Sequence, residues 1–437
     1  MSKLLQIINK AGTIRGLQMF QLFKLGGVLL TGILFTKSSL TIREIGIYES
    51  LVFISTLFSF FWINGILQSL LGNYSKSNPE EGKSRLFNTG ILIVTLNMIL
   101  VAVLWSARPL LAAFLPPEAE EFYPLLLLYV LFNNSSFLIE YRFLLSEKAT
   151  GLFLYGITSF ILQLLFVAGP AIAGYPFVYC IYGLIFIAAL KNLYLLVQFR
   201  KVKRTQITPK SWPVILFSSA PLILSFLISG SSDYIDGILI STQLGSDALA
   251  LYRYGARELP LAVLLASSVT AALLPVLSNR ERFEEGIATL RLESARLMHF
   301  LFPVSILLML SSSYLYPLIF RAEFIQSAGV FNIYLLLIIS RVFFPQAVVM
   351  AHGRNDIIFK VALAEITMNV VASFVLLQFF GMNGVAWGTV LAFFLEKTLL
   401  FIFLRRRFEI GIQQLLPVRL WVLYSTILII TYLFTII

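Results

Sequence analysis

Long apolar runs alternate with short polar segments along the whole chain. Each run reaches the roughly 20 residues that an α-helix needs to cross about 30 Å of hydrocarbon. We predict thirteen membrane-spanning helices, with an error of several residues at each boundary. They fall near residues 16–36, 45–71, 87–114, 122–145, 150–168, 176–199, 213–243, 248–277, 297–319, 327–350, 357–380, 384–404 and 418–437.

The pattern also repeats at a spacing of about 204 residues. Gly32-Ile-Leu-Phe-Thr36 corresponds to Gly237-Ile-Leu-Ile-Ser241, and Glu80-Glu-Gly82 corresponds to Glu284-Glu-Gly286. Because each half then holds six spans, an even number, both halves point the same way and form a parallel repeat. We therefore predict an all-α polytopic membrane protein. Its parts are an N-terminal six-helix lobe at 1–200, a cytoplasmic basic linker at 201–212, a C-terminal six-helix lobe at 213–405 and an extra C-terminal helix at 406–437.

The distribution of Lys and Arg predicts the orientation. With the N-terminus inside, the inner loops, the linker above all, are rich in basic residues, whereas the outer loops are poor in them. Short cytoplasmic loops carry the excess of positive charge in membrane proteins. A cytoplasmic N-terminus is therefore expected.

Composition narrows the function classes. Hydrophobic residues make up 58% of the 437 residues and charged residues 13%, which is far from a soluble domain. The single Cys180 and two separate histidines predict no disulfide, metal or redox chemistry, and no cofactor is expected. The net charge of +11 is spread over short loops, where lipid headgroups attract it, so nucleic acid is not an expected partner.

Charged residues inside the predicted spans are the candidate site. Each costs roughly 2.5–3.5 kcal/mol at mid-bilayer, so such residues usually face a cavity or a partner. Asp233 and Asp236 are three residues apart on the seventh helix, and Arg253 and Arg257 are four apart on the eighth. The aspartates lie about 10–15 Å deep and the arginines about 8–14 Å. An ion-paired clasp between the two helices and a substrate-facing role are both open.

Three further candidates lie in the second, first and tenth predicted helices. Glu49 is the counterpart of Arg253, since each directly follows a tyrosine, and an interlobe cavity would place both on its walls. Lys24 and Arg341 lie deep in the first and tenth helices, and we expect them to face the cavity. By contrast, Glu140, Lys191 and other charges nearer the inner surface are read as ordinary interfacial residues.

Several segments resemble polysaccharide and O-antigen flippases of the multidrug/oligosaccharidyl-lipid/polysaccharide exporter superfamily. They are Asp233-Tyr-Ile-Asp236-Gly-Ile-Leu-Ile-Ser-Thr-Gln-Leu-Gly245, Ala250-Leu-Tyr252-Arg-Tyr-Gly-Ala256, Leu274-Pro275-Val-Leu-Ser278 and Gly381-Met-Asn-Gly384-Val-Ala-Trp-Gly388. The resemblance implies two six-helix lobes that face each other in a V. It also implies export of an undecaprenyl-diphosphate-linked oligosaccharide across the bacterial cytoplasmic membrane by alternating access.

The candidate residues agree with that implication. A diphosphate needs fixed cations, and Lys24, Arg253, Arg257 and Arg341 are available, while Glu49, Asp233 and Asp236 would balance charge or carry a coupling ion, H⁺ or Na⁺. Membrane lipids, and a polysaccharide polymerase and ligase, are the other expected partners of a monomer.

Two alternatives stay open. A multidrug-extrusion transporter of the same superfamily would share the architecture but favour acidic residues for cationic drugs. A membrane enzyme acting on the same lipid would need catalytic groups and usually a large outer loop, and the sequence offers neither.

Overall fold

The computed structural model describes residues 2–74, 79–111, 117–146, 149–200, 207–257 and 259–436. Over these residues the secondary structure is helical, without strands, as expected for the predicted fold class. The chain divides into two compact units, Met1–Gly230 and Ser231–Ile437. This boundary lies inside one long helix, α10 (Trp212–Gln243), within the polar run at 229–232. The lobe limits at 200 and 213, which follow from the sequence repeat, stay a prediction.

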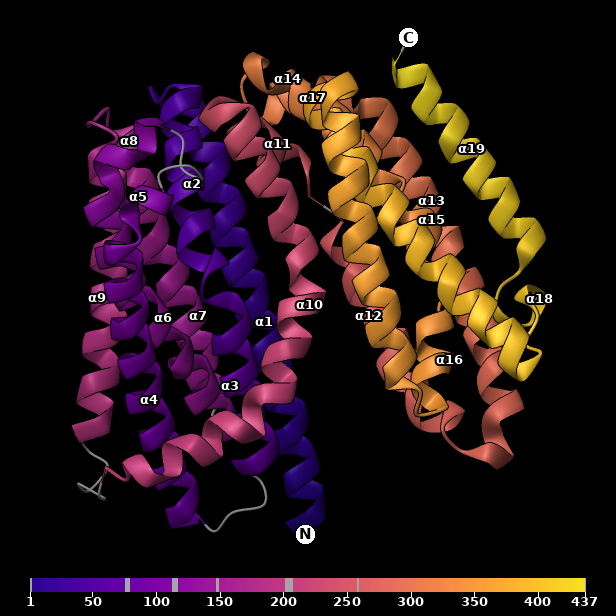
Figure 1. Cartoon of the computed structure of the whole chain (residues 1–437), viewed down its shortest axis with the longest axis horizontal. Coiled ribbons are helices and arrows are strands. Elements are labelled where there is room, and N and C mark those ends of the chain that lie inside the picture. The colour runs from indigo at the N-terminus through magenta and orange to yellow at the C-terminus, as the bar shows by residue number, and fades with distance from the viewer. Residues whose placement is uncertain are drawn as a thin grey trace. The chain divides into compact units, whose positions relative to one another are not determined.

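The helices of the first unit form a bundle in which α1 packs on α7, and α6 packs on both α4 and α9 (Figure 1). Its elements are α1 (Ser2–Lys37), α2 (Ile42–Leu57), α3 (Phe60–Tyr74), α4 (Pro79–Ser106), α5 (Arg108–Leu111), η1 (Pro117–Phe122), α6 (Tyr123–Leu145), α7 (Ala149–Gln163), η2 (Leu164–Ala168), α8 (Gly169–Ile172), α9 (Val178–Arg200) and η3 (Pro209–Ser211), followed by α10.

In the second unit, α13 is central and contacts α12, α14 and α19. The elements are α11 (Gly245–Gly255), α12 (Pro260–Leu277), η4 (Arg280–Arg282), α13 (Phe283–Ile319), η5 (Ala322–Phe324), α14 (Ile325–Leu335), α15 (Ile338–Arg341), α16 (Pro345–Ala351), α17 (Asn355–Phe408), α18 (Ile412–Leu415) and α19 (Val418–Ile436).

The described residues hold ten helices long and apolar enough to cross a membrane, or eleven if the bent pair α2–α3 is one span. The difference from thirteen arises at two places. The eighth predicted span is divided into α11, which ends at Gly255, and α12, which begins at Pro260, because Pro260 supplies no backbone N–H to a continuing helix. The eleventh and twelfth predicted spans are counted together as α17, although this helix is interrupted between them at Gly381. A multi-pass membrane protein is thereby confirmed.

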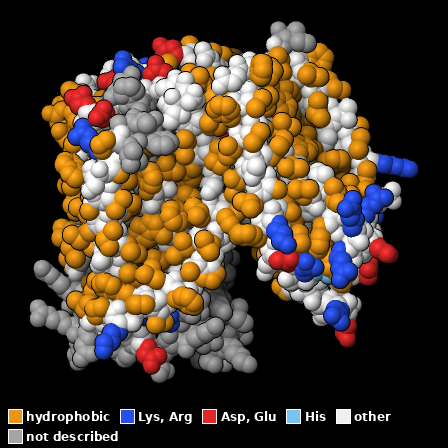
Figure 2. Space-filling view, in the orientation of Figure 1, with side chains coloured by type: hydrophobic (Ala, Val, Ile, Leu, Met, Phe, Trp, Pro, Cys, Tyr) orange, Lys and Arg blue, Asp and Glu red, His pale blue; other side chains and the backbone are white. Residues whose placement is uncertain are grey.

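The surface in Figure 2 is the one expected for membrane-spanning helices. Hydrophobic side chains cover most of the visible face of each unit. In the second unit the basic side chains gather mostly in the lower part of that view. An apolar belt with charges toward the helix ends is the surface that a bilayer requires.

The long helix α17 is interrupted at Gly381, whose backbone has φ 57° and ψ −138°. These angles are disfavoured for residues with a Cβ. The chain folds back there, and a Cβ on Gly384 would lie 2.1 Å from the backbone oxygen of Leu376. The two halves of α17 therefore touch backbone to backbone, which explains the small residues at Gly384 and Gly388.

Gly384→Ala is expected to destabilise the protein by about 1–3 kcal/mol, because the added methyl group has no space and the helix halves must separate. Thermal unfolding of the detergent-solubilised chain measures this effect. Gly26→Ala in α1 is the matched control, because its Cβ would meet Phe160 at an ordinary contact distance of 3.6 Å. An equal loss of stability in both variants would contradict the packing argument.

Helix α19 is attached to the second unit by polar contacts as well as by packing. The indole Nε1 of Trp421 donates to the backbone oxygen of Ile339 at 2.9 Å. The Trp387 indole in α17 donates to the Tyr432 hydroxyl at 3.2 Å. The thirteenth predicted helix is thus an integral part of this unit, and its 19 residues are long enough to count among the candidate spans.

Candidate functional site

In the first unit, Lys24 of α1 is paired with a carboxylate. Its Nζ lies 3.3 Å from Oε1 of Glu140 on α6, and 5.0 Å from the centre of the Phe137 ring. The Lys24 side chain is 45% exposed, whereas that of Glu140 is 13% exposed. The ammonium is therefore held in position by a largely buried partner while part of it stays accessible. The sequence alone predicts an interfacial charge at Glu140 and gives no sign of its pairing with Lys24.

A cavity of about 370 Å³ lies near this pair, between the end of α6 and helices α7 and α9. Lys191 of α9 lines it, with Nζ 5.8 Å from the centre of the Tyr155 ring. Lys191 also interacts electrostatically with Glu140 and Lys24. The charges of Lys24 and Lys191 both act on the Glu140 carboxylate, and of these two described lysines Lys24 alone forms an ion pair with it. Lys191 joins the candidate residues, although its position in the sequence suggested an interfacial role.

Glu49 is buried in α2, with 7% of its surface exposed. The helix begins with a capping box, in which the Thr41 hydroxyl accepts from the Glu44 N–H and the Glu44 carboxylate accepts from the Thr41 N–H. This cap fixes the start of the helix and thereby the face on which Glu49 lies. A buried carboxylate is costly, so Glu49 stays a candidate for the charge-balancing role.

The main polar cluster of the second unit surrounds Asp236 of α10, which is 2% exposed. Its Oδ2 accepts hydrogen bonds from the hydroxyls of Tyr252 (2.7 Å), Tyr334 (3.1 Å) and Thr389 (2.5 Å). These donors come from α11, α14 and α17, so one carboxylate connects four helices. Hydrogen bonds to a buried charged group are among the stronger ones in proteins.

Asn369 extends this cluster along α17. Its Nδ2 donates to the Thr389 hydroxyl at 3.1 Å. The residue is fully buried, and no described residue donates to its Oδ1. Because buried amide oxygens are rarely left without a donor or an ion, this oxygen is notable beside a carboxylate and a hydroxyl. Thr389 and Asn369 are uncharged, so the search for charges within the predicted spans did not find them.

Arg257 lies in the break between α11 and α12. Its Nε donates to the backbone oxygen of Arg253 at 3.1 Å, and its guanidinium lies 5.4 Å from the centre of the Tyr254 ring. Both arginines are half-buried. Non-helical backbone at membrane depth is tolerated where it is buried in protein or lines a water-filled cavity. Here the Tyr254 carbonyl near the break accepts from the Tyr316 hydroxyl at 3.0 Å.

Arg341 occupies a second break, at the end of the short helix α15. Its guanidinium lies 4.5 Å from the centre of the Phe393 ring on α17. The next carbonyl, that of Val342, accepts from the buried Ser294 hydroxyl at 2.6 Å. The tenth predicted span is thus divided into α14, α15 and α16, and side chains of neighbouring helices satisfy the freed carbonyl.

The side chain of Asp233 lies outside the described residues. Of the other candidates, Asp236 joins a hydroxyl cluster, while Arg253 and Arg257 lie one turn apart and Lys24 pairs with Glu140. The described residues contain no group of three or more His, Cys, Asp or Glu side chains that would hold a metal. The arrangement offers fixed cations for an anion and a buried carboxylate for a small cation.

The fold has known counterparts. The chain is similar to the lipid II flippase MurJ in an inward closed conformation, with a TM-score of 0.66 and 16% identity over 98% of each chain. It is also similar to an inward-facing multidrug resistance MATE family transporter of the MOP superfamily, with a TM-score of 0.65 and 16% identity over 88% of this chain and 94% of that one. A MOP superfamily transporter from Pyrococcus furiosus matches with a TM-score of 0.58 and 13% identity, over 92% and 95% of the two chains. The fold is thus that of the MOP superfamily.

A family model described as a polysaccharide biosynthesis protein matches residues 40–329. The chain belongs to this family of polysaccharide biosynthesis proteins. No curated protein sequence matches it. Family and fold together confirm the resemblance that the sequence segments indicated.

Proposed function

We propose that this protein is a flippase that exports an undecaprenyl-diphosphate-linked oligosaccharide, such as an O-antigen repeat unit, across the bacterial cytoplasmic membrane by alternating access. The N-terminus lies in the cytoplasm in this proposal. Membership of a polysaccharide biosynthesis family supports a glycan substrate, and similarity to a lipid II flippase supports a lipid-linked one. A monomeric state and an association with a polymerase and a ligase stay predictions.

One observation carries the proposal: Arg257 keeps donors for an anion, whereas the Asp236 carboxylate in the same unit accepts three hydroxyl hydrogen bonds. The terminal amino groups of Arg257 make no hydrogen bond to any described residue, and only Nε is used, toward a backbone oxygen. Two parallel N–H donors in a fixed fork match the oxygens of a phosphate. Lys24, Arg253 and Arg341 supply further positive charge within the spans.

The burial of the acidic side chains argues against cationic drugs as the substrate. A drug-extrusion transporter would need accessible acidic groups, but Asp236 is 2% exposed and accepts three hydroxyl hydrogen bonds. Glu49 is similarly buried. Their burial fits a coupling or charge-balancing role better than contact with a bulky cation.

Asp236, Thr389 and Asn369 are proposed as the site of the coupling ion. The carboxylate, hydroxyl and amide oxygens are ligands that hard cations prefer, and protonation of Asp236 is the alternative for a proton-coupled cycle. Binding of a cation there would draw together α10 and α17. In this scheme the ion gradient drives the change of access, and the arginines hold the diphosphate.

The test is a flipping assay with the purified full chain in proteoliposomes. An undecaprenyl-diphosphate-linked oligosaccharide with a fluorescent sugar is placed in the bilayer, and its transfer between leaflets is read from quenching by an impermeant reagent. We expect protein-dependent flipping of this lipid and no protein-dependent uptake of ethidium. Ethidium transport without lipid flipping would contradict this proposal and identify drug extrusion as the function.

A further inference from the structure

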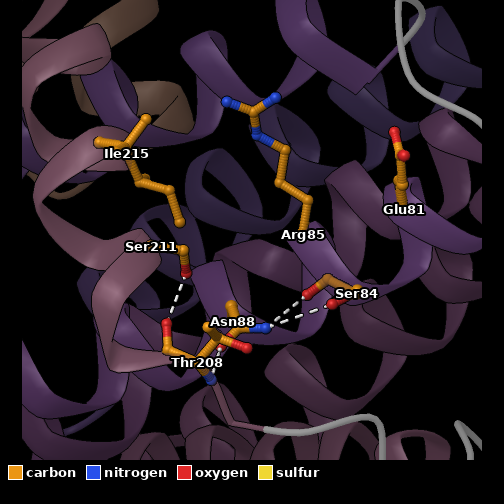
Figure 3. A pocket seen from close by; sticks show the side chains of 8 residues that line it. Glu81, Ser84, Arg85, Asn88, Thr208, Ser211 and Ile215 are labelled. Carbon is orange, nitrogen blue, oxygen red and sulfur yellow. Dashed lines mark hydrogen bonds between the residues drawn. The ribbon is translucent and has the colours of Figure 1, made fainter.

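A pocket of about 360 Å³ lies within the first unit, at the start of α4 and of α10. It is separate from the charged groups described above. Figure 3 shows its lining, which includes Ser84, Arg85 and Asn88 from α4 together with Thr208, Ser211 and Ile215. The positive-inside prediction puts this end of the unit at the cytoplasmic surface.

A buried amide fixes the shape of the pocket. Asn88 is 3% exposed, and its Oδ1 accepts from the backbone N–H of Thr208 at 2.8 Å. Its Nδ2 donates to the backbone oxygen of Ser84 at 2.9 Å, and the Ser211 hydroxyl donates to the Thr208 oxygen at 2.7 Å (Figure 3). The segment that enters α10 is therefore tied to α4, and the two together form one wall.

Arg85 is the cation of this pocket. Its side chain is half-buried, and it makes no hydrogen bond or ion pair with any described residue. A guanidinium presents five donors in a planar fork that suits the oxygens of a phosphate. The half-buried hydroxyl of Ser84 lines the same space and can donate to a further phosphate oxygen, whereas the Ser211 hydroxyl already donates to Thr208.

The position of the pocket favours a lipid headgroup over a free anion as its ligand. The apolar stretch of α4 begins at Glu81, and Arg85 lies four residues, or about 6 Å, further along the helix, at headgroup depth. Val214 and Ile215 form an apolar wall in the first turn of α10, where acyl chains begin. Glu81 is exposed at the rim and would accept from headgroup hydroxyls.

The surrounding sequence is strongly basic. Positive charge near a membrane surface attracts anionic lipids, and each Lys or Arg contributes about 1 kcal/mol to this attraction. The segments that lead into α4 and α10 contain eight basic residues and two acidic ones, Glu80 and Glu81. The basic residues are Lys76, Lys83, Arg85, Arg200, Lys201, Lys203, Arg204 and Lys210.

We propose that this pocket binds the phosphate headgroup of an anionic phospholipid of the cytoplasmic leaflet, with phosphatidylglycerol as the model ligand. Arg85 and the Ser84 hydroxyl hold the phosphate, and Glu81 accepts from the glycerol hydroxyls. Val214 and Ile215 contact the upper part of an acyl chain. The site is independent of the molecule that is transported. It gives the α4–α10 junction a lipid that fixes its depth in the membrane.

The test uses native mass spectrometry of the full chain in detergent, with added phosphatidylglycerol or phosphatidylcholine. Loss of the guanidinium in Arg85→Gln is expected to weaken phosphatidylglycerol binding about fivefold, which corresponds to about 1 kcal/mol. Arg85→Lys should keep most of the binding, because the charge stays. Arg406→Gln is the matched control, an exposed arginine in the second unit, and should bind like the wild type.

Three results would overturn the proposal. Unchanged phosphatidylglycerol binding in Arg85→Gln would remove Arg85 as the headgroup ligand, provided that gel filtration shows the variant to be folded. Equal losses in Arg85→Gln and Arg406→Gln would indicate attraction by net charge alone. If inorganic phosphate at millimolar concentration displaces the lipid fully, the apolar wall contributes nothing and the pocket is a site for free phosphate.

Discussion

Arg257→Ala is expected to lower the rate of lipid-linked oligosaccharide flipping about 100-fold while the protein level stays normal. In the proposed function the variant would remove two charge-assisted hydrogen bonds to the diphosphate, which together contribute about 3 kcal/mol in a partly desolvated site. The fold should tolerate the change, because Arg257 is half-buried and the break around it is held by Pro260 and by the Tyr316–Tyr254 hydrogen bond. The proteoliposome assay gives the rate, and immunoblotting gives the protein level.

Two variants separate recognition from simple loss of charge. Arg257→Lys keeps the positive charge but loses the planar fork, so a loss of about tenfold is expected. Arg296→Ala is the control, because this arginine is 64% exposed and pairs with Glu293 on the same helix. Normal flipping by Arg257→Ala would show that the diphosphate is held elsewhere. A loss in Arg296→Ala of the same size would point to an effect of net charge.

The hydrophobic pattern alone predicts most of the helices. The windows at 176–199 and 418–437 correspond to Val178–Arg200 and Val418–Ile436. The turn at Gly381 was also expected between the eleventh and twelfth spans, since glycine there tolerates a positive φ. These features depend on local composition, and local composition is what a single sequence contains.

The breaks within spans were less predictable. Hydropathy averages over a window and does not register a lost backbone hydrogen bond, so the eighth and tenth spans were read as continuous helices. Pro260 and Pro345 were the available signals, because each lies at the first position of a new helix segment. Arg257 and Arg341 precede these prolines. A charge three or four residues before a proline inside an apolar window therefore indicates a break as well as a buried cation.

Partners across helices were the part that the sequence could not supply. Counting residues placed Asp236 at a depth, but its donors Tyr252, Tyr334 and Thr389 come from three other helices, up to 153 residues away. Lys24 and Glu140 are likewise 116 residues apart. Such pairs depend on which helices pack together, and helical periodicity alone leaves that choice open.

In Asp236→Asn, the flipping rate is expected to become independent of the ion gradient. An asparagine oxygen can still accept from the three hydroxyls, so the cluster and the fold should persist. However, the negative charge that attracts the cation is lost, which costs about 3 kcal/mol, or about 100-fold in affinity. In proteoliposomes, an inward Na⁺ or proton gradient should accelerate flipping by the wild type. Flipping by Asp236→Asn should be equally slow with and without either gradient.

Thr389→Val and Asp247→Asn test whether the loss of ion dependence in Asp236→Asn arises from the hydroxyl cluster around Asp236. Thr389→Val removes one hydroxyl that donates to Asp236 and neighbours Asn369, so a weaker ion dependence is expected, with a half-saturating concentration about tenfold higher. Asp247 is exposed in the first turn of α11, and Asp247→Asn should leave the ion dependence unchanged. Full gradient dependence in Asp236→Asn would move the coupling site to another carboxylate, of which the buried Glu49 is the first to test. Because Na⁺ and proton gradients are imposed separately, the gradient that drives the wild type also identifies the coupling ion.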